Sequence, residues 1–437
     1  MLKMEIIDKV KQDIKILQKR IDEFTTSNNQ LLIRTMKINK TINDFNTLYY
    51  NLKNDSKLRA INWSEFKSLL NKNDDELSFD EDCVLISGPF IKSQQMILDG
   101  STKRIIINSN VILGKDELCN LAYMFCECSE LETVNVSKMI FENRNYNLES
   151  MFEDCLSIKN IIIGDFSTCY IETVKNMFKN CKELEKINLE KHFCSNIDCY
   201  YESLFEGCNK LVNVGDVLNV VDVSRLSSSK SQKCMFKNCN SIKRVSLPNK
   251  WIINNCDLSS MFENCLQLEV VANIDLLTFK FYNNFNLENM FKNCEKIDYV
   301  DLSEWANAEK KKCIVDCLST CMNCYKLTTF KMFSWASLRL LTSMFENCEK
   351  LSNVYMMDNM LNEGFGCQNM FNNVKTNGLN IIMPALTMWK IISSNVSGLF
   401  DTKGIMKDKE SINNYKFTFE YNSDNNTQIL KSVESYR

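Results

Sequence analysis

The sequence predicts an α/β repeat solenoid of about ten units, each with one short strand and one helical turn, after an N-terminal α-helical coiled coil. Three observations lead to this prediction. The motif Met-Phe-x-x-Cys recurs about every 24 to 31 residues. A short strand-like pattern of apolar residues follows each Cys, and a heptad pattern covers the start of the chain. A fixed period of this length is typical of stacked repeats, which bury one continuous core.

Length and charge narrow the possible functions. The chain has 437 residues, more than one ordinary core holds, whereas a stack of repeats can grow lengthwise. A net charge of −3 gives no general attraction to nucleic acid, so we expect no such partner. No apolar run approaches the roughly 18 residues of a membrane helix, so we expect no membrane span. Charges at Lys3, Glu5 and Asp8 interrupt any signal-peptide core, which favours a reduced, cytoplasmic setting.

Residues 1–54 carry the heptad pattern and are predicted to form a helical coiled-coil segment. Ile at the first heptad position and Leu at the fourth, with one buried Asn, favour a parallel pair of helices, and three helices remain possible. The chain would thus be a homo-dimer or trimer. The alternative is a helix, or a hairpin breaking near residues 25–28, that folds back on its own chain. The expected oligomerisation residues are Ile7, Val10, Ile14, Leu17, Ile21, Phe24, Asn28 and Leu31.

The next two segments lead into the repeats. Residues 55–82 are predicted to be a connector with a short helix at Trp63–Leu70. Residues 83–117 are predicted to be an N-terminal β cap, because a solenoid needs its exposed end covered. The expected strands of this cap are Cys83–Ile86, Met96–Leu98 and Arg104–Ile107.

Residues 118–384 are the predicted solenoid. The motif and the apolar residue three positions before it have helical spacing, and Leu-x-x-Leu-x-Leu after the Cys puts two apolar groups on one face of a short strand. The recurring cysteines predict a column of buried thiols, since Val374 fills this position in the last unit and can neither bridge nor ligate. The column comprises Cys128, Cys155, Cys181, Cys208, Cys239, Cys265, Cys294, Cys324 and Cys348.

The repeat motif resembles that of the BspA-like leucine-rich repeat family. One example is Met177-Phe178-Lys179-Asn180-Cys181, continuing to Leu184, Ile187 and Leu189. The resemblance implies a leucine-rich-repeat solenoid and a role in adhesion at the cell surface. The chain departs from the family by adding the heptad segment and by showing no export signal.

The period is lost after residue 384. Residues 385–437 are predicted to be a C-terminal cap and a polar tail. Alternating residues predict a strand over Tyr415–Tyr421, and Gln428–Tyr436 is predicted to form a short helix.

Few residues suggest catalysis or cofactor binding. His192 beside Cys194 is a conceivable nucleophile pair, but a solvated loop histidine is the simpler interpretation. Cys313, Cys317, Cys321 and Cys324 have spacing that could hold zinc, yet they also form one core-facing stripe. Glycine-rich nucleotide motifs are absent. We therefore expect no cofactor, no metal and no enzymatic activity.

The strand side chains that point away from the core are the best place for a binding surface. They are mixed and carry no basic stripe. The candidate partner contacts are Tyr299, Tyr355, Arg244 and Lys331, against the alternative of a solvated polar face. The sequence thus predicts a non-enzymatic protein–protein interaction or scaffold protein in the cytoplasm, with location at the cell surface or in a larger assembly as alternatives. The alternative function is a BspA-like cell-surface adhesin.

Overall fold

The structure is a computed structural model of the whole chain, which divides into two units, Met1–Arg59 and Ala60–Arg437. All described residues except Arg59 belong to the second unit. The coiled coil predicted for residues 1–54 and its eight oligomerisation residues lie outside the described residues. The structure describes residues 59–80, 83–86, 102–108, 111–113, 118–141, 145–164, 170–185, 187, 199–212, 231–247, 252–253, 257–279, 284–307, 313–394, 400–401, 411–423 and 427–436.

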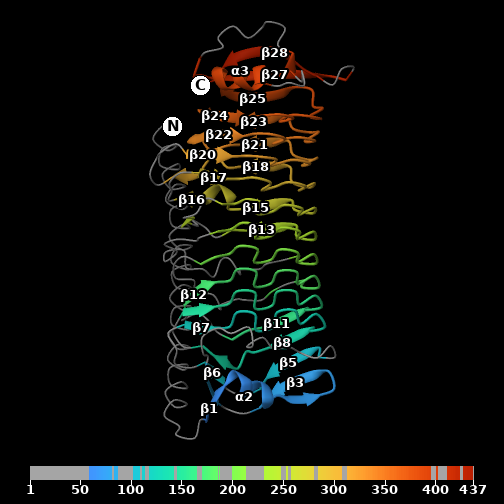
Figure 1. Cartoon of the computed structure of the whole chain (residues 1–437). Coiled ribbons are helices and arrows are strands. Elements are labelled where there is room, and N and C mark those ends of the chain that lie inside the picture. The colour runs from blue at the N-terminus through green and yellow to red at the C-terminus, as the bar shows by residue number, and fades with distance from the viewer. Residues whose placement is uncertain are drawn as a thin grey trace, which may run out of the picture. The chain divides into compact units, whose positions relative to one another are not determined.

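The second unit is built from coils that stack through parallel strands, as Figure 1 shows. Each coil contributes a strand to the main column, which we call the strand face. Within each of its three sheets the members pair in register with the next coil, for example β8 with β11 and β21 with β23. The strand face comprises β5 (Arg104–Ile107), β8 (Thr133–Asn135), β11 (Asn160–Ile162), β13 (Arg244–Ser246), β15 (Val270–Ala272), β18 (Tyr299–Asp301), β21 (Thr329–Lys331), β23 (Asn353–Tyr355) and β25 (Leu379–Pro384).

Two further columns of short strands complete the coils. The first contains β4 (Cys83–Ile86), β6 (Val111–Leu113) and β9 (Met139–Ile140), then β14 (Ile252–Ile253), β16 (Thr278–Phe279) and β19 (Ala306–Asn307). The second contains β7 (Leu118–Asn120), β10 (Asn145–Asn147) and β12 (Tyr170–Thr173), then β17 (Asn284–Asn286), β20 (Cys313–Asp316), β22 (Ala336–Leu340) and β24 (Met360–Gly366). The predicted repeat solenoid is therefore present, with more strand than expected.

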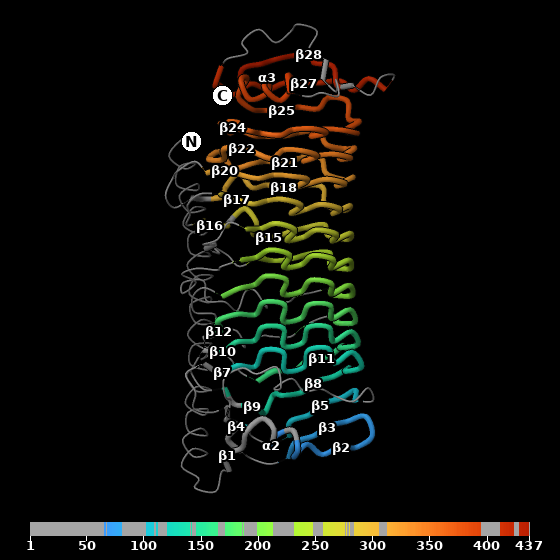
Figure 2. Tube along the Cα trace, in the orientation of Figure 1, coloured from blue at the N-terminus to red at the C-terminus, as the bar shows by residue number. Residues whose placement is uncertain are grey.

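The Met-Phe-x-x-Cys segments are pairs of β-turns, so the predicted helical turn is wrong. In the coil at Met151, the amide of Met151 donates to Leu148 O at 3.3 Å and that of Cys155 donates to Phe152 O at 3.2 Å. The third residue of each turn, Ser150 or Asp154, has a positive φ of 54° or 60°, as a type II turn requires. We call this row of paired turns the turn edge; its stepped path recurs from coil to coil in Figure 2.

Two turns in tandem place apolar residues three and four positions apart, as a helix does, which explains the error. The apolar residues of the turns point inward and stack between coils. The rings of Phe178 and Phe205 are 5.6 Å apart and 7° from parallel, and those of Phe236 and Phe262 are 5.5 Å apart and 1° from parallel. Such repeated stacking fixes the spacing of the coils.

Four elements precede the repeats, and two of them, β2 and β3, join the sheet of the strand face, whereas β1 belongs to the sheet of β4, β6 and β9. The four elements are β1 (Arg59–Asn62), α2 (Trp63–Ser68), β2 (Asn71–Asn73) and β3 (Glu76–Phe79). β3 pairs parallel with β5, and β2 pairs antiparallel with β3. Residues 71–79, which we expected to lie in a connector, are thus strands of the strand face. The strand expected at Met96–Leu98 lies outside the described residues.

The C-terminal end reverses strand direction. After β25 come α3 (Ala385–Ser394), β26 (Phe400–Asp401), β27 (Asn414–Asn422) and β28 (Thr427–Ser435). β27 pairs antiparallel with β25, and β28 antiparallel with β27. The helix predicted over Gln428–Tyr436 is therefore wrong, because this segment pairs along its length with β27. Gln428 is fully buried and its Nε2 donates to Val374 O at 2.7 Å, which satisfies a carbonyl of the last coil.

Candidate interaction surface

The cysteine column lies inside the turn edge, and its thiols have hydrogen-bond partners. Cys155 Sγ donates to Phe125 O at 2.9 Å, and Cys181 Sγ donates to Phe152 O at 3.2 Å. The same bond from each Cys to the preceding coil continues through Cys208, Cys239, Cys265, Cys294, Cys324 and Cys348. Cysteine is thus a compact apolar group that also donates one hydrogen bond between coils, a role that the sequence did not reveal.

Burial raises the pKa of column thiols such as Cys155, Cys181 and Cys239 well above the ordinary value. Desolvation raises the pKa of Cys265 to about 12, although the Cys239 backbone opposes the shift. A thiolate is needed for nucleophilic attack or metal ligation, so this column is chemically inert in the folded chain. The sixteen cysteines whose side chains the structure describes are all free thiols.

The cysteines that suggested zinc occupy packing positions. Cys313 lies on β20. Cys317, Cys321 and Cys324 fill the Leu, Phe and Cys positions of the paired turns in a single coil. Among the described residues there is no group of three or more His, Cys, Asp or Glu side chains placed to hold a metal ion. His192 lies outside the described residues.

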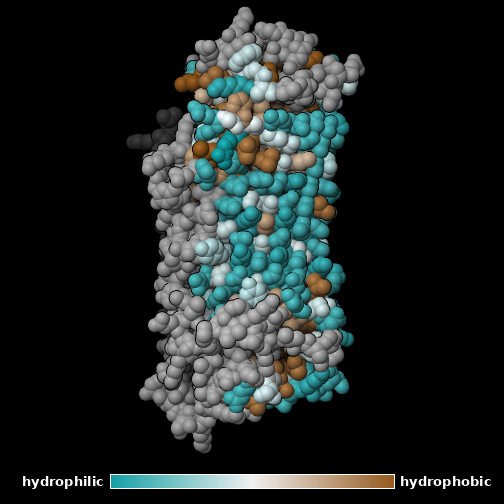
Figure 3. Space-filling view, viewed as in Figure 1, coloured by the Kyte–Doolittle hydropathy of each residue, from teal (hydrophilic) through white to brown (hydrophobic). Residues whose placement is uncertain are grey.

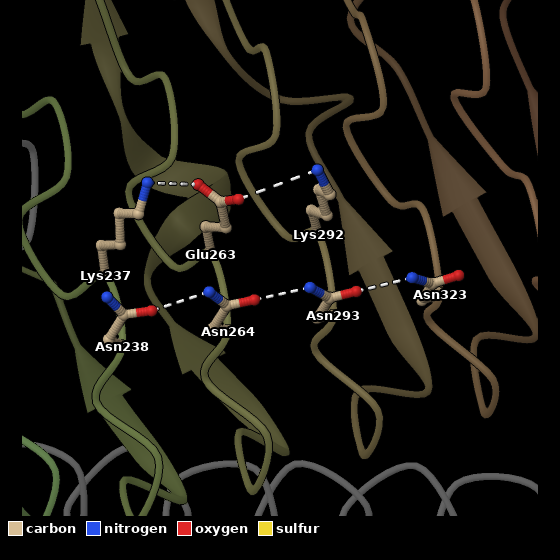
Figure 4. Close-up of polar contacts among 7 residues, drawn as sticks. All are labelled: Lys237, Asn238, Glu263, Asn264, Lys292, Asn293 and Asn323. Atoms are coloured by element: carbon tan, nitrogen blue, oxygen red, sulfur yellow. Dashed lines mark hydrogen bonds and ion pairs between the residues drawn. The ribbon is translucent and has the colours of Figure 1, made fainter.

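An asparagine ladder runs along the outside of the turn edge (Figure 4). Each amide nitrogen donates to the side-chain oxygen of the preceding coil: Asn264 to Asn238 at 2.7 Å, and Asn293 to Asn264 at 2.5 Å. The ladder comprises Asn238, Asn264, Asn293, Asn323, Asn347 and Asn373. Each member has a positive φ, which Asn tolerates better than most residues, so one residue type serves both backbone and side-chain needs.

Glycine interrupts this ladder at one coil. Gly207 has a φ of 77°, and a Cβ there would lie 2.4 Å from Asn180 Oδ1. Asn180 instead pairs with Asp154, donating to its Oδ1 at 2.8 Å. The row of ladder positions is therefore divided at Gly207 into a short first part, which contains Asp154 and Asn180, and a longer second part, which is the asparagine ladder.

A column of alternating charge lies beside the ladder. Lys237 Nζ lies 2.9 Å and Lys292 Nζ 3.9 Å from carboxylate oxygens of Glu263, whose side chain is 11% exposed (Figure 4). Lys179 pairs with Glu153 at 3.2 Å. From the N-terminal end the column reads Glu153, Lys179, Glu206, Lys237, Glu263 and Lys292. If one coil were skipped in the stack, two like charges would become neighbours. The alternation therefore favours the observed order of coils.

The strand face brings three of the four predicted contact residues together. Lys331 Nζ lies 5.4 Å from the ring centroid of Tyr299 and 5.9 Å from that of Tyr355. The same ammonium pairs with Asp301 at 2.8 Å, and Tyr299 donates its hydroxyl to Asp301 at 2.5 Å. We call Tyr299, Asp301, Lys331 and Tyr355 the tyrosine cluster; Asp301 was missing from the predicted contacts. Arg244, exposed on β13, is not part of it.

The cluster is preorganised by its own hydrogen bonds. Partial burial opposes ionisation of Asp301, but hydrogen bonds from Lys331, Ser303 and Tyr299 lower its pKa to about 2. Hydrogen bonds to Asp301 and Tyr299 raise the pKa of Lys331. The side chain of Tyr299 is nonetheless 47% exposed. The cluster thus presents aromatic surface and internally neutralised charge on paired strands of one sheet.

The described part of the face seen in Figure 3 is mostly hydrophilic, with small separate hydrophobic patches. Among the described residues, no helix has the length and apolar character needed to cross a membrane. These features and the buried core columns define a repeat solenoid with a polar, side-chain-laddered surface.

The comparisons with known proteins place the chain in a family. Residues 119–251 and 230–357 match the family described as "Mycoplasma protein of unknown function, DUF285". Together the matches span more than half of the 437 residues, so the chain belongs to this family. A comparison with curated proteins found no match.

Two similar solved structures are leucine-rich-repeat proteins, the type that the repeat motif resembles. A leucine-rich repeat protein from Bacteroides ovatus is 17% identical; the match covers 65% of this chain and 86% of that chain, with a TM-score of 0.27. The LRR ectodomain of the plant membrane receptor kinase GASSHO1/SCHENGEN3 from Arabidopsis thaliana is 13% identical. That match covers 64% of this chain and 30% of that chain, with a TM-score of 0.28. At these TM-scores neither match bears on function.

Proposed function

We propose that this protein is a non-enzymatic interaction or scaffold protein that binds a protein partner through the tyrosine cluster. One observation carries the proposal: Tyr299, Asp301, Lys331 and Tyr355 converge on neighbouring strands of one sheet, where Tyr299 is exposed. Tyrosine is favoured at the centre of interfaces because it offers large apolar area and loses little conformational freedom. A preorganised patch also loses less entropy on binding.

Affinity capture from the native source tests this proposal. The full chain and a Y299A/Y355A variant would be compared, with T133A/S246A as control because Thr133 and Ser246 occupy the same two strand positions in other coils. We expect a specific protein to be captured by the wild type and the control, and its recovery to fall about tenfold or more with Y299A/Y355A. Equal recovery by all three chains would contradict the proposal.

We further propose that the heptad segment joins two or three chains, so that weak contacts act together. The heptad positions of residues 1–54 support this proposal. In the full chain, I14D/L17D removes two apolar seam positions, and Q12D/K19D changes two positions outside the seam. Light scattering should give a monomer for the first variant and the wild-type mass for the second. A wild-type chain that is already monomeric would contradict this proposal.

A reducing, cytoplasmic compartment is also part of the proposal, and the inert thiol column supports it. Thiol counting on denatured native protein should then find close to all 21 cysteines free. A count well below that number would favour the surface adhesin instead.

A further inference from the structure

The carboxylate of the tyrosine cluster has its hydrogen-bonding capacity fully used within the chain. Asp301 Oδ1 accepts from Ser303 N at 3.0 Å and from Ser303 Oγ at 2.6 Å. Its Oδ2 accepts from the Tyr299 hydroxyl at 2.5 Å and from Lys331 Nζ at 2.8 Å. A carboxylate has about four lone-pair sites, so Asp301 has none left for a donor of a partner.

The donors of the cluster are used less completely. A lysine ammonium has more N–H donors than the two that Lys331 gives to Asp301 and to the Tyr299 hydroxyl. The Lys331 side chain is 33% exposed, so a further N–H is available at the surface. The hydroxyl of the half-buried Tyr355, whose ring lies beside this ammonium, forms no hydrogen bond with another described residue. The cluster therefore has donors to offer to a partner but no free carboxylate oxygen.

Uncharged residues surround these two donors. Apart from Lys331, β21 and β23 contain only uncharged residues, and the residues directly before these strands, Thr328 and Ser352, are also uncharged. The exposed carboxylates of Asp298 and Glu304 lie before and after β18, in the preceding coil. An acidic group that approaches over β21 and β23 therefore meets an ammonium and a hydroxyl, and these two strands present no carboxylate to it.

Apolar surface borders the same donors. Tyr299 begins β18 and is exposed, and Val270, which begins β15 in the coil before it, is 40% exposed. Aromatic and aliphatic groups beside a charged donor let a partner bury apolar area while its polar group is held in one position. The surface thus suits a segment in which an acidic side chain has an apolar neighbour.

We propose that the tyrosine cluster binds the carboxylate of an Asp or Glu side chain of the partner protein. The carboxylate accepts hydrogen bonds from Lys331 Nζ and the Tyr355 hydroxyl, and an adjoining apolar side chain packs on Tyr299. A carboxylate only accepts hydrogen bonds, so it matches a surface with free donors. A carboxamide would also bring N–H donors, which Asp301 has no site left to accept. This inference rests on the proposed function and names the side chain that the same cluster recognises, with Lys331 as the specificity-determining residue.

Selection from a phage-displayed library of random linear peptides tests this specificity. The target is the full chain, and peptides that also bind Y299A/Y355A are removed. The selected peptides should share an Asp or Glu beside an apolar residue. One of them is then synthesised together with a form in which each acidic residue is replaced by its amide. By fluorescence anisotropy the amide form should bind the wild type about tenfold more weakly, because a hydrogen bond to a charged group is lost.

Variants of the chain assign this preference to Lys331. In K331M the acid and amide peptides should bind within about twofold of each other, because the ammonium that distinguishes them is absent. K331R keeps N–H donors and should still prefer the acid form, which separates loss of the donor from loss of structure. The matched control is K390M, since Lys390 is exposed on α3 and forms no ion pair with another described residue. K390M should keep the full preference.

Three results would overturn the inference: selected peptides that lack an acidic residue, equal binding of the acid and amide peptides by the wild type, or a preference that persists in K331M. In each case the peptides still distinguish the wild type from Y299A/Y355A, so the proposed function would stand. If the wild type selects no peptide that Y299A/Y355A rejects, the inference fails, and the capture experiment decides the proposed function separately.

Discussion

The turn edge and the strand face belong to the same coils but follow different rules. Along the turn edge, Phe stacks on Phe, Cys bonds to the preceding carbonyl and Asn bonds to Asn. Along the strand face the outward residues change from Arg244 to Val270 to Tyr299, and strand pairing itself stops between β15 and β18. Stability is therefore concentrated where neighbouring coils are alike, and recognition is expected where they differ.

The largest contrast should come from aromatic side chains. Phe236 is fully buried between Phe205 and Phe262, so F236A should lower the free energy of unfolding by about 3–5 kcal/mol. Y299A on the strand face should change it by less than about 0.5 kcal/mol. Urea denaturation of the two variants measures the difference, and similar losses would show that the strand face also carries stability.

The asparagine ladder should give the next largest effect. N293A removes hydrogen bonds to Asn264 and Asn323 and puts Ala at a φ of 63°, for an expected loss of about 2–3 kcal/mol. N293G removes the same bonds without the backbone strain and should lose about 1 kcal/mol less than N293A. Denaturation curves separate the two terms; identical curves would mean that the positive φ carries no cost.

Loss of a thiol hydrogen-bond donor should lower the free energy of unfolding by a smaller amount. C265V fills the site with a group like the natural Val374 but cannot donate to Phe236 O, so we expect a loss of about 1 kcal/mol. The folded wild type should also leave Cys265 unalkylated by iodoacetamide at pH 8, since burial raises its pKa to about 12. Rapid labelling of Cys265, compared by mass spectrometry with the half-buried Cys234, would contradict the sealed column.

One substitution at the turn edge should stabilise the protein. Glu127 occupies the ladder position of its coil with a φ of 63°, next to the like-charged Asp154 of the following coil. E127N relieves backbone strain and repulsion and should raise the free energy of unfolding by about 0.5–1 kcal/mol. E130N, a nearby exposed change away from the ladder, should be neutral. A destabilised E127N chain would show that the Glu127 carboxylate has a favourable role.

Low pH should remove the stability that Asp301 contributes on the strand face. The pKa of Asp301 is about 2 in the folded chain against an ordinary 3.8. A lowered folded pKa contributes stability that is complete above 3.8 and is lost as the pH falls toward 2. The difference in unfolding free energy between wild type and D301N should therefore narrow across that window. A difference that stays constant from pH 5 to about 2 would show that the cluster does not stabilise the charged carboxylate.

The turn edge could be predicted from the sequence more fully than the strand face could. The period of Met-Phe-x-x-Cys was enough to predict stacked coils, and Val374 indicated that the cysteines pack in the core. The turns were mistaken for helix because Leu148, Met151 and Phe152 have the same spacing in both. The signal that could have corrected this was the repeated Asn before Cys, because Asn tolerates a positive φ better than most residues.

The features that could not be predicted depend on contacts between segments far apart in the sequence. Gln428–Tyr436 forms a strand because β27 lies beside it, a contact that local residue preferences do not encode. Asp301 joins the tyrosine cluster through Lys331 in the next coil. The break in strand pairing between β15 and β18 was not predicted either, because Val270–Ala272 has an ordinary strand pattern.

The direction of the asparagine ladder has a consequence for chemical ageing. Every side-chain amide donates its hydrogen bond toward the N-terminal side. Only the first residue of a row therefore needs no amide, and Asp154 is such a residue. Deamidation of Asn293 would leave a carboxylate with no proton to pass to Asn264. Slow hydrolysis in storage should thus weaken the molecule at the interior rungs, whereas Asp154 has no amide to hydrolyse.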